Sequence, residues 1–204
     1  TDGGDGIDRI IVTGQDISAS NNPLLGGLNA MKSIEIIEFD GNDFVKVDGD
    51  TFKNADVTKF LINTDGKSTE IDQIDNARSS IVYAFGDDND DGAIINMKAG
   101  NTTANIAFEN RTVNDHAHVT GNLVIKGAST INISSTDSTA GANTENHVET
   151  LVNDKGALIN VTGDAAFEIG RRVVEFERDE ALPGRLLQVF QHALVAGVVG
   201  DREA

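Results

Sequence analysis

The sequence contains no cysteine, no tryptophan and only two prolines, Pro23 and Pro183. Without cysteine, neither a disulfide nor a thiolate metal site contributes to the fold. No apolar run approaches the roughly 18 residues that a membrane-spanning helix needs. These absences argue against a disulfide-stapled scaffold and against membrane insertion.

Basic residues are also scarce, with 16 lysines and arginines against 33 acidic residues and a formal net charge of −17. Such a surface repels nucleic acid and anionic membranes and attracts cations, so we expect no nucleic-acid partner. The chain starts at Thr1 without an apolar leader, so we expect an internal fragment or a processed chain. The composition suits an exported bacterial surface protein, and it equally fits an acidic cytosolic one.

Short β-branched segments alternate with polar turns along most of the chain. Four to seven apolar-rich residues bounded by Gly, Asn and Asp are typical of strands and tight turns. The pattern therefore predicts an all-β protein. The expected strands are 7–14, 33–39, 44–47, 57–63, 79–85, 93–97, 104–108, 121–127, 130–134, 147–152, 157–163 and 165–169.

The strand pattern favours a parallel β-solenoid over its alternative, a β-sandwich. Several strands carry adjacent aliphatic residues, and segments such as NLVIKG and LINVTG recur at an irregular spacing of about 20 residues. In a solenoid each rung packs only on its neighbours, so loops of unequal length are tolerated. We therefore predict an irregular parallel β-solenoid of the β-helix or β-roll kind.

The composition changes after residue 170, where the sequence suggests a domain boundary. Residues 1–170 carry a net charge of −16 and residues 171–204 a net charge of −1. The segment 185–197 has the apolar spacing of an amphipathic helix, preceded by Pro183-Gly184. We expect 1–170 to form the solenoid and 171–204 to be either a helical cap or a tail of foreign origin.

Two stretches have the composition of calcium loops. Residues 3–11 read GGDGIDRII, which fits the nonapeptide G-G-x-G-x-D-x-U-x of calcium-binding β-rolls. Residues 87–92 read DDNDDG, so Asp87, Asn89 and Asp91 alternate as they do in the first half of an EF-hand loop. Lys98 stands where that loop needs a bidentate glutamate. The loop is therefore no EF-hand, and its alternative interpretation is a solvated hairpin tip.

Other polar clusters have simpler explanations. Asp43 and Asp48 flank the strand FVKV, and Asp-Gly turns account for them better than a shared cation. His116 and His118 have the spacing of zinc ligands on one strand face, but a third ligand is missing, so exposed loop histidines are expected. The sequence has no nucleophile elbow, P-loop or dinucleotide fingerprint. We therefore predict no enzymatic activity, although 33 acids always leave room for a glycosidase pair.

Together, the nonapeptide, the acidic loop, the rungs such as LINVTGDAAFEI and the lack of cysteine resemble Gram-negative bacterial S-layer proteins of the RTX-related, type I-secreted class. The resemblance covers residues 1–170. It implies calcium as cofactor, with Asp5 and Asp8 as ligands by match to the nonapeptide and Asp87, Asn89 and Asp91 by match to the loop. Two departures are the single nonapeptide and the absence of an acidic-then-apolar C-terminal tail.

The resemblance further implies a secreted protein that assembles with copies of itself into a lattice on the cell surface, with cell-surface polysaccharide as a further partner. The alternative is an adhesin or a phage receptor-binding module that grips glycans. A polysaccharide-degrading enzyme is a third function, disfavoured because basic residues that would neutralise uronate substrates are few and scattered.

Overall fold

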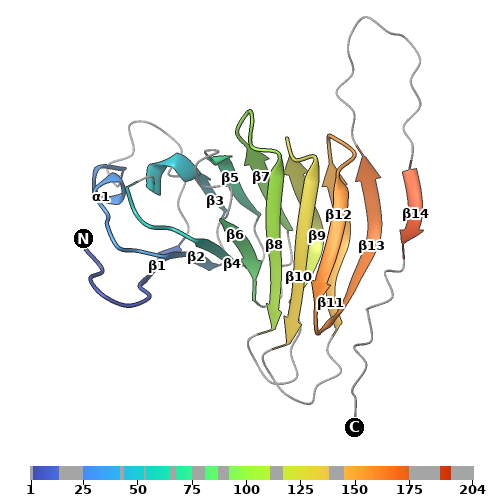
Figure 1. Cartoon of the computed structure of the whole chain (residues 1–204), viewed down its shortest axis with the longest axis horizontal. Helices are drawn as coiled ribbons and strands as arrows, with labels where there is room; N and C mark the ends of the chain where they lie inside the picture. The colour runs from blue at the N-terminus through green and yellow to red at the C-terminus, as the bar shows by residue number, and fades with distance from the viewer. Residues whose placement is uncertain are drawn as a thin grey trace, which may run out of the picture.

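The structure is a computed structural model that describes residues 2–13, 25–41, 44–52, 54–64, 68–74, 81–86, 92–110, 117–137, 145–174 and 189–193. These residues form two seven-stranded sheets stacked face to face (Figure 1). In chain order the strands alternate between the sheets, beginning with β2 and β3. From β2 to β13 each rung therefore contributes one strand to each sheet, which defines a parallel β-solenoid.

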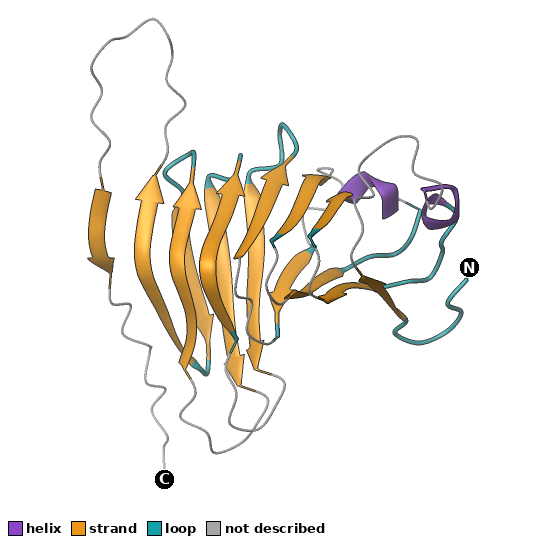
Figure 2. Cartoon of the chain, turned by 180° about the vertical axis from the view of Figure 1, so that it is seen from behind, coloured by secondary structure: helices purple, strands orange, loops and turns teal. Residues whose placement is uncertain are grey.

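The first sheet, in spatial order, contains β1 (Arg9–Thr13), β2 (Ile36–Gly41), β4 (Lys59–Thr64), β6 (Val82–Phe85), β8 (Thr103–Asn110), β10 (Thr130–Asp137) and β12 (Leu158–Gly163). The second sheet contains β14 (Val189–Ala193), β13 (Ala166–Val174), β11 (Glu145–Asn153), β9 (His118–Lys126), β7 (Gly92–Met97), β5 (Thr69–Ile74) and β3 (Val45–Asp48). A short helix, α1 (Leu25–Asn29), and a 3-10 turn, η1 (Gly49–Phe52), lie near the N-terminal end (Figure 2).

The strand register places residues of similar character next to one another on neighbouring strands. In the first sheet, Phe60 pairs with Ile37 on one side and with Tyr83 on the other. The rung length varies, because Lys59 pairs with Val82 whereas Ala93 pairs with Leu123. Variable rungs are accommodated in the turns, since only the strands must align with their neighbours.

The core lies between the two sheets and is continuous from β1 to β13. Phenylalanine rings stack along the first sheet, with the centroids of Phe39 and Phe60 5.8 Å apart and those of Phe85 and Phe108 5.3 Å apart. All four rings are fully buried. Offset stacking of this kind adds to the burial energy of each ring, so aromatic side chains, few as they are, are concentrated at the centre of the rungs.

The fold class predicted from the sequence is confirmed. Apart from β14, every strand pair is parallel, which excludes the alternative, an antiparallel β-sandwich. From β2 to β13, each strand pairs with the strand two places along in the sequence, as a solenoid requires.

The C-terminal helix expected over 185–197 is wrong for the described part of that segment. Residues 189–193 form β14, which pairs antiparallel with β13, Val173 opposite Val189. The free edge of β13 offers backbone hydrogen-bond partners that the helical pattern in the sequence does not reveal. The boundary after residue 170 stays a prediction; Gly170 lies within β13, and residues 175–188 and 194–204 lie outside the described part.

Candidate functional site

The glycine-rich turn at the N-terminus packs tightly against the following rung. A Cβ on Gly3 would overlap the carbonyl oxygen of Ser33 and would lie 2.8 Å from the Asp8 carboxylate. Gly4 and Gly6 have positive φ angles of 88° and 124°, which side chains disfavour. The glycines of the nonapeptide are therefore required by close approach and by backbone conformation.

This turn places the Glu35 carboxylate against the backbone of Asp8. The backbone N–H of Asp8 donates to Glu35 Oε2 at 2.8 Å, and Asp8 Oδ2 is buried without a hydrogen-bond partner among the described residues. The nearby Ser33 has a positive φ of 51°, the one non-glycine residue with that conformation in the described ranges. A buried carboxylate oxygen without a donor is costly unless a cation or water satisfies it.

The donor set fits calcium in kind. Asp8, Glu35 and the Ser33 carbonyl supply hard oxygens, which Ca²⁺ prefers, although three are fewer than its usual six to eight. Asp5 is exposed in the same turn. Within the described ranges no three histidine or carboxylate residues converge closely enough to hold a metal, so the assignment of Asp5 and Asp8 stays a prediction. Sequence reasoning missed Glu35 and Ser33 because the nonapeptide pattern does not include them.

The acidic loop connects the two sheets, but Asp87, Asn89 and Asp91 lie outside the described residues. The residue after the loop is well defined: Gly92 has a φ of 83°, and a Cβ there would overlap the backbone of Asn122. The glycine predicted at the sharp turn is thus needed for close packing against β9. The calcium assignment for the loop itself remains a prediction.

A second polar cluster lies on the outer face of the second sheet. Lys46 Nζ donates to Glu70 Oε1 at 2.7 Å and lies 3.3 Å from Asp72 Oδ2. Asn96 donates to both carboxylates. The hydrogen bond that Lys46 donates to Glu70 and the charge of Asp72 raise the pKa of the Lys46 ammonium above its ordinary value of 10.5, against the opposing effect of burial. Since each charge has a partner, the cluster stabilises three neighbouring rungs.

The remaining acidic turns and histidines have structural partners. Asp48 Oδ1 accepts from the backbone N–H of Asp50 at 3.0 Å, which is an ordinary Asx turn; Asp43 lies outside the described residues. His118 is not an exposed loop residue as expected. It is half-buried in β9, and its ring stacks on that of His147 with the centroids 4.6 Å apart. His116 lies outside the described part of the chain.

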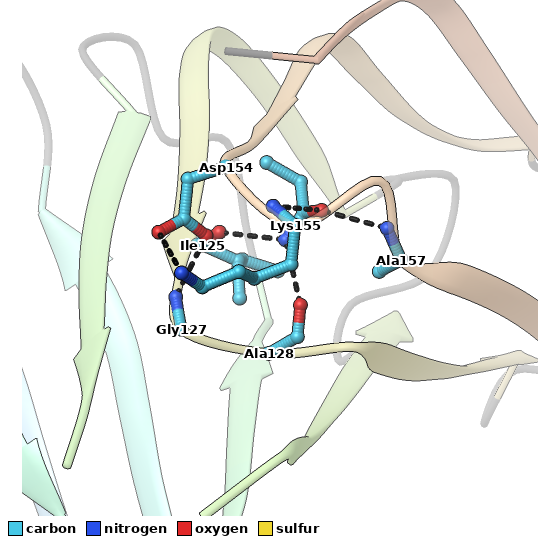
Figure 3. A network of polar contacts seen from close by, with 7 residues as sticks. Ile125, Gly127, Ala128, Asp154, Lys155 and Ala157 are labelled. Carbon is cyan, nitrogen blue, oxygen red and sulfur yellow. Dashed lines mark hydrogen bonds and ion pairs between the residues drawn. The ribbon is translucent and has the colours of Figure 1, made fainter. Parts of the chain in front are cut away.

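Two buried asparagines in β11 link neighbouring rungs. The amide of Asn153 donates to the carbonyls of Ile125 and Ala128, and its oxygen accepts from the N–H groups of Lys155 and Ala157 at 3.1 and 2.8 Å. Figure 3 shows these bonds around the turn after β11, together with the bond from Gly127 N–H to Asp154.

At the other end of β11, Asn146 is fully buried, and its Nδ2 donates to Ser135 Oγ at 2.9 Å. Its oxygen accepts from the N–H of Ala117 at 3.0 Å. Both asparagine side chains hydrogen-bond to backbone groups at the points where the chain turns between the sheets, so those groups are satisfied without a strand partner. These residues are therefore structural.

Outward-facing asparagines also form a ladder along the first sheet. Asn132 Nδ2 donates to Asn105 Oδ1 at 3.1 Å, and Asn160 Nδ2 donates to Asn132 Oδ1 at 2.9 Å. The three residues are in register on adjacent strands. These side-chain hydrogen bonds run from strand to strand, as the backbone hydrogen bonds of the sheet do. The ladder therefore reinforces the stacking of the rungs.

The fold defines the chain as a two-sheet parallel β-solenoid protein. No family model, no curated protein and no solved structure matches it. None of the helices in the described ranges has the length and hydropathy needed to cross a membrane.

Proposed function

We propose that this protein is a structural module of a bacterial surface layer: it is secreted, is stabilised by calcium and associates with copies of itself on the outer cell surface. The observation that carries the proposal is the architecture. Every rung of the described chain is stacked on the next by parallel ladders, and the first sheet ends at both sides in a strand with only one neighbour. Stacked rungs with open edges are suited to forming extended assemblies.

The N-terminal turn supports the calcium component. Among the described residues, Asp8 Oδ2 is a buried acceptor without a donor, and the Glu35 carboxylate accepts from the backbone N–H of the same residue. A buried carboxylate oxygen without a donor is costly unless a cation or a water molecule satisfies it. A chain with a net charge of −17 also repels its own copies, and bound Ca²⁺ would reduce that repulsion. Calcium would thus stabilise both the fold and the assembly.

The test is negative-stain electron microscopy of the full chain in millimolar Ca²⁺ and in EDTA, with Mg²⁺ as the control cation. We expect ordered sheets or filaments with calcium and dispersed particles in EDTA. Particles that stay dispersed in all three conditions would exclude the assembly function. A glycan array run in parallel identifies the adhesin alternative, which would bind a sugar without assembling.

A further inference from the structure

Within the described ranges, the first strand of the solenoid has an unpaired edge. Among the described residues, β1 has β2 as its only neighbour in the first sheet. The carbonyl of Asp8 accepts from the N–H of Ile36 at 3.1 Å, so the backbone of Asp8 points toward β2. Because backbone groups alternate along a strand, those of Arg9, Ile11 and Thr13 point toward the free edge.

Three of the four large hydrophobic side chains that are exposed in the described ranges lie at this end of the molecule. The large hydrophobic residues exposed among the described positions are Ile7, Ile11, Phe44 and Leu158. Ile7 and Ile11 belong to the first rung, and Phe44 precedes β3, the edge strand of the second sheet at the same end. The β1 sequence RIIVT contains neither proline nor lysine, the residues that commonly protect an edge.

We infer that β1 pairs antiparallel with β1 of a second copy, with Ile11 opposite Ile11 of the partner subunit on a twofold axis. The inference rests on the proposed self-association and specifies its interface. In this register the three residues with outward backbone groups oppose one another, as a hydrogen-bonded antiparallel ladder requires. Ile11, which is 48% exposed, becomes covered by its own counterpart.

Charge complementarity supports the same register. Arg9 then lies opposite Thr13 of the partner subunit, and Asp40 is the residue paired with Thr13 on β2. Asp40 is exposed and alternates with the buried Phe39, so its carboxylate is on the outer face with Arg9. Arg9 already forms an ion pair with Glu38 of its own subunit at 2.8 Å, and its side chain stays 44% exposed. In the dimer, each Arg9 would therefore also approach Asp40 of the partner subunit, one strand beyond the interface.

The opposite end of the molecule is less suited to this contact. There, β14 extends the second sheet one strand past β13, whereas the first sheet stops at β12. At the N-terminal end α1 lies beside the first rung (Figure 1), and its exposed Gly26 and Gly27 leave room for a neighbour. No strand extends past β1 at this end, but α1 and the segment before β1 lie farther out (Figures 1 and 2), so a partner strand has to pack alongside them.

The absence of cysteine allows a direct test of the register. Ile11→Cys introduces the only thiol of the chain, so any disulfide joins two molecules. Residues that face each other in a hydrogen-bonded antiparallel pair have Cα atoms about 5.5 Å apart, which suits a disulfide. Thr13→Cys is the matched control, because the two Thr13 residues would lie about 14 Å apart. Leu158→Cys controls for exposure on the other edge strand.

Under mild oxidation we expect Ile11→Cys to form disulfide dimers several-fold faster than either control, and wild-type protein to show a monomer–dimer equilibrium in sedimentation velocity. Asp40→Lys should weaken the dimer relative to Asp56→Lys, which makes the same charge change at an exposed turn. Equal crosslinking rates for the three cysteine variants, or a wild-type protein that stays monomeric, would overturn the inference.

The two proposals can fail separately. Calcium-dependent sheets without preferential Ile11→Cys crosslinking would leave the assembly function standing and reject this interface. A dimer crosslinked at Ile11 that never grows larger would support the interface and reject the lattice.

Discussion

At the residue scale, Asn153 illustrates how a single buried amide holds the chain between rungs. It satisfies four backbone groups at the turn after β11 and is 1% exposed. Asn153→Ala would leave these groups without partners and should lower the free energy of unfolding by about 3 kcal/mol. Urea denaturation measures this loss. Asn160→Ala, at the exposed end of the asparagine ladder, should cost less than about 0.5 kcal/mol. Equal losses would mean that burial of the amide is not the cause.

Lys46 gives a prediction for alkaline pH. Its pKa is raised in the folded state by the hydrogen bond with Glu70 and the charge of Asp72. A raised folded pKa means that the ion pairs contribute their full stability below the unfolded pKa and lose it as the pH rises through the folded pKa. Wild type should therefore lose stability above pH 10.5 relative to Lys46→Met. Denaturation midpoints across this range measure the difference. Lys155→Met, at a more exposed lysine, should follow the wild-type curve.

At the element scale, the strands were predictable where apolar residues dominate and were missed where they do not. The prediction placed strands close to β4, β7 and β10 because β-branched residues mark them. It missed β5, TEIDQI, in which Ile71 is buried while Glu70 and Asp72 face outward. The partners of those carboxylates, Lys46 and Asn96, come from neighbouring rungs and are invisible to a local pattern.

The candidate site was predicted in part for a similar reason. The nonapeptide identified the turn and Asp8, because its glycines have local conformational causes. Glu35 and the Ser33 carbonyl come from the next rung, and only the parallel register of β1 and β2 brings them to Asp8. Likewise, the helical spacing of 185–197 could not indicate that β13 offers an open edge. A helix of that length is marginal without tertiary packing.

The pairing of β14 with β13 can be tested by truncation. Removing residues 175–204 deletes β14 and leaves the edge of β13 unpaired. We expect amide hydrogen exchange to accelerate in β13 and to stay unchanged in β9, which keeps both of its neighbours. Exposure of the edge should also promote aggregation. A truncated protein with unchanged exchange in β13 would contradict the strand assignment.

At the scale of the whole molecule, the net charge of −17 leads us to expect that bound calcium raises the stability. A cation that binds only the folded state at a hundredfold excess over its Kd contributes about 2.7 kcal/mol. For a chain of this size, we expect millimolar Ca²⁺ to raise the Tm by about 5–10 °C, as measured by calorimetry. EDTA should reverse the shift, and Mg²⁺ should produce less, because it demands octahedral geometry.

Variants separate the two candidate calcium sites. Asp8→Asn should reduce the calcium-dependent shift if the N-terminal turn binds the ion, and the triple alanine variant of Asp87, Asn89 and Asp91 should reduce it if the acidic loop does. Asp56→Asn, at an exposed aspartate, is the control. A wild-type Tm that is indifferent to both calcium and EDTA would remove calcium from the proposed function.

The parallel register has a consequence for how the protein forms during synthesis. In the parallel sheets each strand pairs with a strand one rung earlier in the sequence. Leu123, for example, pairs with Ala93, which is synthesised before it, and needs no residue near the C-terminus. The sequence separation of pairing partners thus stays about one rung however long the chain becomes. Loop closure costs the same modest entropy at each step, and each completed rung presents a template for the next. The polypeptide can therefore fold vectorially, from its first residues to its last, as it leaves the ribosome.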